Sequence, residues 1–237
     1  MAIKDLLLTS LPQYCEDLVS GKNVCFRPII IAEEKALLLA IQTDNKQSIL
    51  KTMINVMSSC FGGNKDWTIA DFEHMFLLLR AKSIGEIEGF TITCPHTKEE
   101  VNIKINLTKQ IRLTKNKSSN KVKINDNLVV IFKEPTVKHL LKYPNYKTST
   151  DEFYGFIASC IKQIQNQKEN IDCSELPEKE VIEFVQNLTS SQFKSVINYF
   201  DTLPQVEVYG EYQTSDGVNR EIRIRGLFDF ISFFLNI

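Results

Sequence analysis

The residues best suited to chemistry are Cys94 and His96, in the segment CPHTKEE. A tight turn could present the thiolate and the imidazole together, and both are ligands that zinc prefers. Structural zinc needs four such ligands, so the others would have to come from isolated residues such as Cys60 or His74. We expect no metal site, and a small zinc-dependent nucleic-acid-binding module stays open only as an alternative.

No other residues have the types and spacing that catalysis needs. The sequence lacks the glycine-rich phosphate loops, the serine nucleophile motif and the paired-histidine metal motif. The acidic pairs Glu33-Glu34 and Glu99-Glu100 fit a helix start and a hairpin turn better than a hydrolytic pair. We therefore expect no catalytic residue, no cofactor and no small-molecule substrate, so the protein is predicted not to be an enzyme.

The overall charge argues against a nucleic-acid or membrane partner. The 237 residues carry a formal net charge of −1, which gives no general attraction to phosphates or anionic lipid. The locally basic segment RLTKNKSSNKVK, residues 112–123, lacks the interleaved aromatic side chains that stack on bases. No stretch approaches the roughly 20 apolar residues that span a bilayer. We expect neither kind of partner.

The cysteines point to a reducing compartment. No two of them form a Cys-x-x-Cys pair, and most fall within or beside apolar stretches. Such cysteines usually pack as small apolar side chains. All six are therefore predicted to be reduced thiols in a cytoplasm: Cys15, Cys25, Cys60, Cys94, Cys160 and Cys173.

The segment TIADFEHMFLLLRAKSIGE, residues 68–86, predicts a central helix. Thr68 can cap its start, and Trp67 can pack on Phe72 as a hydrophobic staple. Its apolar positions are too many for a surface helix, so we expect it to be buried on most sides. Gly85 is placed to end it, and Arg80 is expected to pair with Glu86 across the turn.

The remaining pattern indicates an α+β fold, a helix-rich chain with two β-hairpins and additional short strands. The hairpins, at 88–107 and 205–226, could pair into one mixed sheet flanked by helices. Three parts are expected: residues 1–113 with the first hairpin, a linker or loop at 114–120, and a second α+β region at 121–237 that ends in an apolar tail. Helical segments are predicted at 3–19, 32–43, 46–60, 136–143, 150–166, 177–188 and 190–202, and further strands at 25–31, 121–124 and 127–132.

The tail GLFDFISFFLNI contains four phenylalanines, too many for a chain end to leave in water. It must fold back on the core or dock into another chain. Phe230, Phe233 and Phe234 are accordingly candidates for partner binding.

Four segments, in order, resemble the baseplate hub assembly protein family of T-even-like contractile-tailed bacteriophages. They are FRPIIIAEEKALLLAIQT, DWTIADFEHMFLLLRAKSIGE, CPHTKEEVNIKINL and GLFDF. The resemblance is close over residues 25–113 and looser beyond them. Where other members carry a Cys-x-x-Cys knuckle in the hairpin, this chain has Cys-Pro-His-Thr.

The resemblance implies a viral protein that works by protein–protein contact, without enzymatic activity. It would be a chaperone or assembly factor for the baseplate hub, with other baseplate or hub proteins as partners, in the cytoplasm of the infected bacterium. The alternative is a permanent hub subunit in the virion tail baseplate. The polar end of the central helix adds Arg80, Lys82 and Glu86 to the partner-binding candidates.

Overall fold

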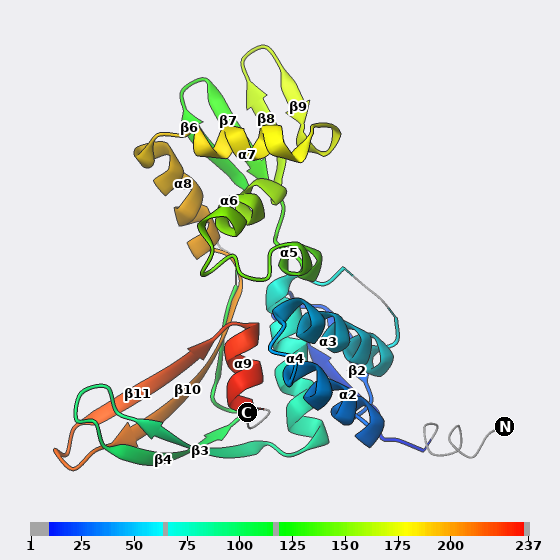
Figure 1. Cartoon of the computed structure of the whole chain (residues 1–237), viewed down its shortest axis with the longest axis vertical. Coiled ribbons are helices and arrows are strands. Elements are labelled where there is room, and N and C mark those ends of the chain that lie inside the picture. The colour runs from blue at the N-terminus through cyan, green and yellow to red at the C-terminus, as the bar shows by residue number, and fades with distance from the viewer. Residues whose placement is uncertain (1–9, 64–65, 116–118, 235–237) are drawn as a thin grey trace.

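The helices and strands gather in two lobes (Figure 1). The computed structural model describes residues 10–63, 66–115 and 119–234. The lower lobe of Figure 1 contains β1 (Tyr14–Asp17), β2 (Asn23–Phe26), α2 (Ile31–Ile41), α3 (Lys46–Phe61), α4 (Ile69–Ser83), β3 (Ile87–Thr93), β4 (Glu100–Asn106), β5 (Ile111–Thr114), β10 (Gln205–Gln213), β11 (Asn219–Arg225) and α9 (Leu227–Phe234).

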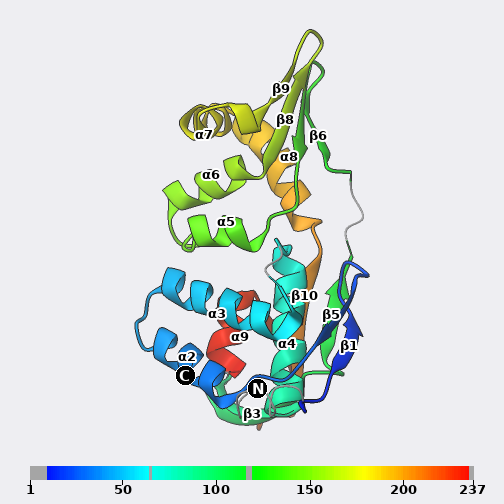
Figure 2. The same ribbon diagram turned by 90° about the vertical axis from the view of Figure 1, so that its right-hand side faces the viewer.

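The upper lobe is formed by the middle of the chain. It contains β6 (Lys121–Asn125), β7 (Leu128–Phe132), α5 (Val137–Lys142), α6 (Thr150–Ser159), β8 (Ile161–Asn166), β9 (Asn170–Asp172), the short 3₁₀ helix η1 (Cys173–Glu175), α7 (Glu178–Gln186) and α8 (Ser190–Asp201). Helices α6 and α7 lie on one side of its sheet (Figure 2). The predicted linker or loop at 114–120 starts at the last residue of β5 and ends just before β6, and the separate 121–237 region stays a prediction.

Helix α4 is the centre of the lower lobe, as its sequence predicts. The Thr68 hydroxyl accepts a hydrogen bond from the Asp71 backbone N–H at 3.2 Å, which caps the helix. The rings of Trp67 and Phe72 lie 5.8 Å apart, which confirms the staple. Every residue from Ala70 to Ala81 is buried. The helix stands between α3 and the sheet that contains β10 (Figure 2), so no broad side of it faces water.

The fold class is α+β, as predicted, but the strands of the described residues form four separate antiparallel sheets. The sheets are β1-β2, β3-β4, β11-β10-β5 and β6-β7-β8-β9. The single mixed sheet expected from the two hairpins is therefore wrong. Strand β4 packs against the face of β10 instead, where Ile105 approaches so closely that a Cβ on Gly210 would lie 3.0 Å from its side chain.

A network of charged side chains ties β5 to the C-terminal hairpin. Arg112 on β5 donates to Glu207 at 3.1 Å and to Glu221 at 2.6 Å, and its guanidinium stacks 3.9 Å from the ring centre of Tyr209. Arg225 donates to Glu207 from the other side. These bonds join a strand that precedes the upper lobe to two strands that follow it.

Two predicted helices are wrong at one end. Residues 150–166 form a helix only to Ser159, and Ile161 begins strand β8. Ile161 and Ile164 are buried in this strand, although their separation of three residues is typical of one face of a helix. Of the predicted lead-in helix at 3–19, residues 3–9 lie outside the described part, and Tyr14–Asp17 is a strand.

Candidate partner-binding surface at the end of α4

Arg80 lies inside the protein rather than on a surface. It is 4% exposed and forms an ion pair with Glu88, which is 8% exposed. Its other terminal nitrogen donates to the carbonyl of Gly85 at 3.3 Å. The predicted pairing with Glu86 is therefore wrong. Successive residues of β3 point to opposite sides, and Glu88 is the one that faces the core where Arg80 lies.

Lys82 and Glu86 do lie together at the surface. Lys82 Nζ donates to Glu86 Oε1 at 3.0 Å, and the same ammonium lies 5.6 Å from the ring centre of Tyr14. The hydrogen bond from Lys82 lowers the pKa of the Glu86 carboxyl. The end of α4 thus presents one cation and one anion, both held by neighbours.

The start of α2 is attached to the end of α4. The backbone N–H of Ile29 donates to Ser83 Oγ at 2.9 Å, and that hydroxyl donates to the carbonyl of Leu79 at 2.6 Å. Arg27 holds Glu33 through two parallel bonds of 2.9 and 2.6 Å. Burial raises the pKa of Glu33, but the bonds from Arg27 and from the Ile30 N–H outweigh it and lower the pKa to about 2. The carboxylate stays ionised and keeps α2 in place.

Three isoleucines stand in water on these joined segments. Ile31 is 78% exposed, Ile84 51% and Ile87 64%. With Lys82 and Glu86 they make up what we call the junction surface. Sequence reasoning missed the isoleucines because it assigned apolar residues to the core. Only the strand alternation, with Glu88 facing inward, gave a signal that Ile87 faces outward.

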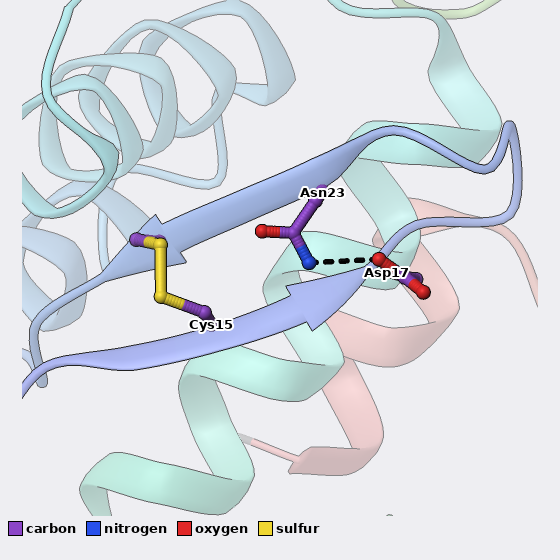
Figure 3. Close-up of a disulfide and its surroundings, with 4 residues drawn as sticks. Cys15, Asp17 and Asn23 are labelled. Carbon is purple, nitrogen blue, oxygen red and sulfur yellow. Dashed lines mark hydrogen bonds between the residues drawn. A yellow bond between two sulfur atoms is a disulfide. The ribbon is translucent and has the colours of Figure 1, made fainter.

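The β1-β2 hairpin beside this surface is closed by a disulfide (Figure 3). Cys15 and Cys25 are paired directly across the two strands and are bonded to each other. Asn23 also donates to Asp17 at 2.7 Å across the hairpin. The prediction of reduced thiols is therefore wrong for this pair, because the register brings two distant cysteines face to face. Cys60, Cys94, Cys160 and Cys173 are free and buried, as predicted.

The C-terminal tail folds back on the core. Phe230 is 0% exposed, and the ring of Phe233 lies 5.3 Å from that of Phe90 on β3. Phe234 ends α9, and its side chain lies outside the described part. A partner would not reach Phe230 or Arg80 directly in this structure. Partner binding by the predicted candidates stays a prediction.

The turn between β3 and β4 contains Cys94 and His96, and it contacts the β10-β11 hairpin. Cys94 is buried, and the Tyr212 hydroxyl of β10 lies 3.6 Å from its sulfur, whereas His96 is exposed. Burial raises the pKa of Cys94, but hydrogen bonds from the Thr97 and His96 backbones and from Tyr212 outweigh it and lower the pKa to about 7. Within the described residues, no group of three or more His, Cys, Asp or Glu side chains could hold a metal ion.

Comparisons with known proteins identify the family. The family model described as T4 bacteriophage base plate protein matches residues 12–232, which is nearly the whole chain. Neither the curated proteins nor the solved structures give a match. Among the residues described, no helix is both long and apolar enough for a membrane crossing. The chain therefore belongs to the T4 bacteriophage base plate protein family.

Proposed function

We propose that the protein promotes assembly of the baseplate hub by binding another hub protein through the junction surface. Membership of a baseplate family supports a role among tail proteins. The observation that carries the proposal is the exposure of Ile31, Ile84 and Ile87 on segments joined by the bond from Ile29 to Ser83, beside the Lys82–Glu86 pair. Apolar side chains surrounded by polar groups are typical of protein–protein contact sites.

The junction surface is already in one conformation before a partner arrives. The buried Arg80–Glu88 pair fixes one side of it, and the bond from Ile29 to Ser83 fixes the other. A surface that is ordered in advance loses little conformational entropy on binding. This suits an assembly factor, which must recognise its partner without covalent chemistry.

The test is to place charges on the junction surface and follow the partner. In the variant Ile84→Asp/Ile87→Asp, two exposed apolar side chains become carboxylates, and the core is not touched. We expect this variant to lose co-purification with hub proteins from infected cells, measured by mass spectrometry. The control is Val218→Asp, because Val218 is 49% exposed but lies at the far β10-β11 turn. Equal recovery of hub proteins with both variants would overturn the proposal.

A permanent place in the virion is the second candidate function. The description of the matching family as a base plate protein favours it. The two candidates differ in the finished particle, since a chaperone leaves the hub and a subunit stays. Quantitative mass spectrometry of purified virions distinguishes them: a stoichiometric amount identifies a subunit, and absence from particles that needed the protein for assembly identifies a chaperone.

A further inference from the structure

A cavity of about 720 Å³ lies in the upper lobe, well away from the junction surface. It opens between α5, the end of α6, the start of β8, η1 and α7. Its apolar lining includes Ala158, Ile161 and Val181, which are 3%, 4% and 5% exposed. The floor can therefore receive an apolar side chain.

Four lysines surround this floor. Lys138 is paired with Asp66 at 3.1 Å, and Lys142 is paired with Glu178. The other two, Lys133 and Lys162, are exposed and have no hydrogen bond or ion pair from their side chains within the described residues. Two ammonium groups beside an apolar floor are thus available to a ligand.

One carboxylate that lines the same cavity, Asp172, is already engaged. Asp172 accepts hydrogen bonds from the backbone N–H and the hydroxyl of Ser174, at 2.9 and 2.7 Å. These bonds, with smaller contributions from Lys162 and Lys133, lower the pKa of Asp172. Asp172 forms neither a hydrogen bond nor an ion pair with Lys133 or Lys162 among the described residues.

The wall between α5 and α6 is fixed by a histidine. His139 Nδ1 accepts from the Thr136 backbone N–H at 2.9 Å, so Nε2 carries the proton and donates to the carbonyl of Ser159 at 3.2 Å. Burial, together with Lys133, lowers the pKa of His139. The ring is neutral and structural, and the cations of the cavity are its lysines.

We infer that this cavity binds an acidic segment of another baseplate protein, with an apolar side chain on the floor and carboxylates on Lys133 and Lys162. Charge complementarity supports a carboxylate ligand, and the buried floor requires an apolar neighbour. A nucleic acid fits less well, because three carboxylates also line the cavity and no Phe, Tyr or Trp is among its described lining residues.

Binding of a model peptide tests the inference. A fluorescein-labelled peptide of alternating leucine and glutamate should bind the purified protein in fluorescence anisotropy. Lys133→Glu/Lys162→Glu should weaken it by about tenfold or more. Lys51→Glu/Lys104→Glu makes the same charge change on exposed lysines of α3 and β4 and should bind as the wild type does.

Two probes separate the alternatives. A peptide with glutamine in place of glutamate keeps the leucines and removes the charge, and a single-stranded oligonucleotide keeps the charge and removes the leucines. The inference is overturned if the glutamine peptide binds equally well, if the oligonucleotide binds more tightly, or if the acidic peptide does not bind.

The natural partner can be located by carbodiimide cross-linking in infected cells, which joins an amine to a carboxylate with loss of water. We expect Lys133 or Lys162 to be linked to an Asp or Glu of another baseplate protein. In Lys133→Arg/Lys162→Arg, the charge remains but the amine is gone, so the cross-link should disappear while association persists. Cross-links confined to other lysines would overturn the inference. Because the junction surface is unchanged in these variants, its own test stands independently.

Discussion

Arg80 and Glu88 form an ion pair that is almost completely shielded from water at the end of α4. Their neighbour Gly85, whose carbonyl also accepts from Arg80, turns the chain from the helix into β3. Gly85 has φ +147, a conformation that a side chain would strain. The ion pair thus fixes the turn that carries the exposed Ile84 and Ile87.

Removing the cation of this pair should strongly destabilise the protein. Arg80→Met leaves the Glu88 carboxylate buried without its partner, and we expect the free energy of unfolding to fall by about 3–5 kcal/mol. Urea unfolding followed by circular dichroism measures the change.

Two further variants show whether the unpaired charge is the cause. Lys82→Met lies two residues away and removes the exposed pair with Glu86 and the contact with the Tyr14 ring, so only a small change is expected. Arg80→Met/Glu88→Leu removes both buried charges and should recover a large part of the lost stability. Wild-type stability in Arg80→Met would contradict the buried pair.

The disulfide of the N-terminal hairpin should be measurable as a loss of stability on reduction. The bond between Cys15 and Cys25 closes a short loop, and its removal should lower the free energy of unfolding by about 2–3 kcal/mol. Dithiothreitol should lower the melting temperature of the wild type but not that of Cys15→Ser/Cys25→Ser. Six reactive thiols in the denatured, unreduced protein would show that the bond does not form.

The parts of the fold that follow from local signals were predictable. Trp67 and Thr68 mark the start of α4 and Gly85 lies just beyond its end, and the structure confirms the helix. The β8 segment was predicted as helix because Ile161 and Ile164 lie three residues apart, which is the spacing of one helix face. Its extended form depends on hydrogen bonding to β7 and β9, which the sequence does not display.

The candidate site was predictable only in part for the same reason. Lys82 lies in the last turn of α4 and Glu86 follows Gly85 directly, so their closeness along the chain suggests that they meet. Burial of Arg80 depends on β3, which places Glu88 inside. Exposure of Ile31 depends on how α2 packs beside the end of α4. Long-range packing decides which of these side chains meets water, and a single sequence contains no direct record of it.

Glu73 should make stability depend on pH. It is 8% exposed on α4, and burial raises its pKa to about 7 although Lys147 and the Leu227 backbone N–H act to lower it. Because the folded pKa exceeds the ordinary value of 4.5, the folded state holds this proton more tightly than the unfolded state. The contribution of protonated Glu73 to the free energy of unfolding is complete below about pH 4.5. It is lost as the pH rises through 7, a loss of about 3 kcal/mol.

The comparison that isolates this carboxyl is with Glu73→Gln. The amide is neutral at every pH, so the stability of the wild type relative to this variant should fall between pH 5 and pH 8. Urea unfolding at several pH values measures both proteins, and other carboxyl groups cancel in the difference. Parallel curves for the two proteins would mean that Glu73 titrates normally.

The C-terminal helix should be part of the folding unit rather than a detachable tail. Phe230 is 0% exposed, and Phe230→Ala should lower the free energy of unfolding by about 3–5 kcal/mol because it leaves a cavity. Phe228 is only half-buried, with Lys46 5.4 Å from its ring centre, so Phe228→Ala should cost less.

Truncation after Arg225 also removes the buried Leu227 and Ile231, and it should unfold the lower lobe instead of leaving a folded core. Cooperative unfolding of the truncated chain at the wild-type urea concentration would show that α9 is dispensable, and the tail would again be free to serve a partner.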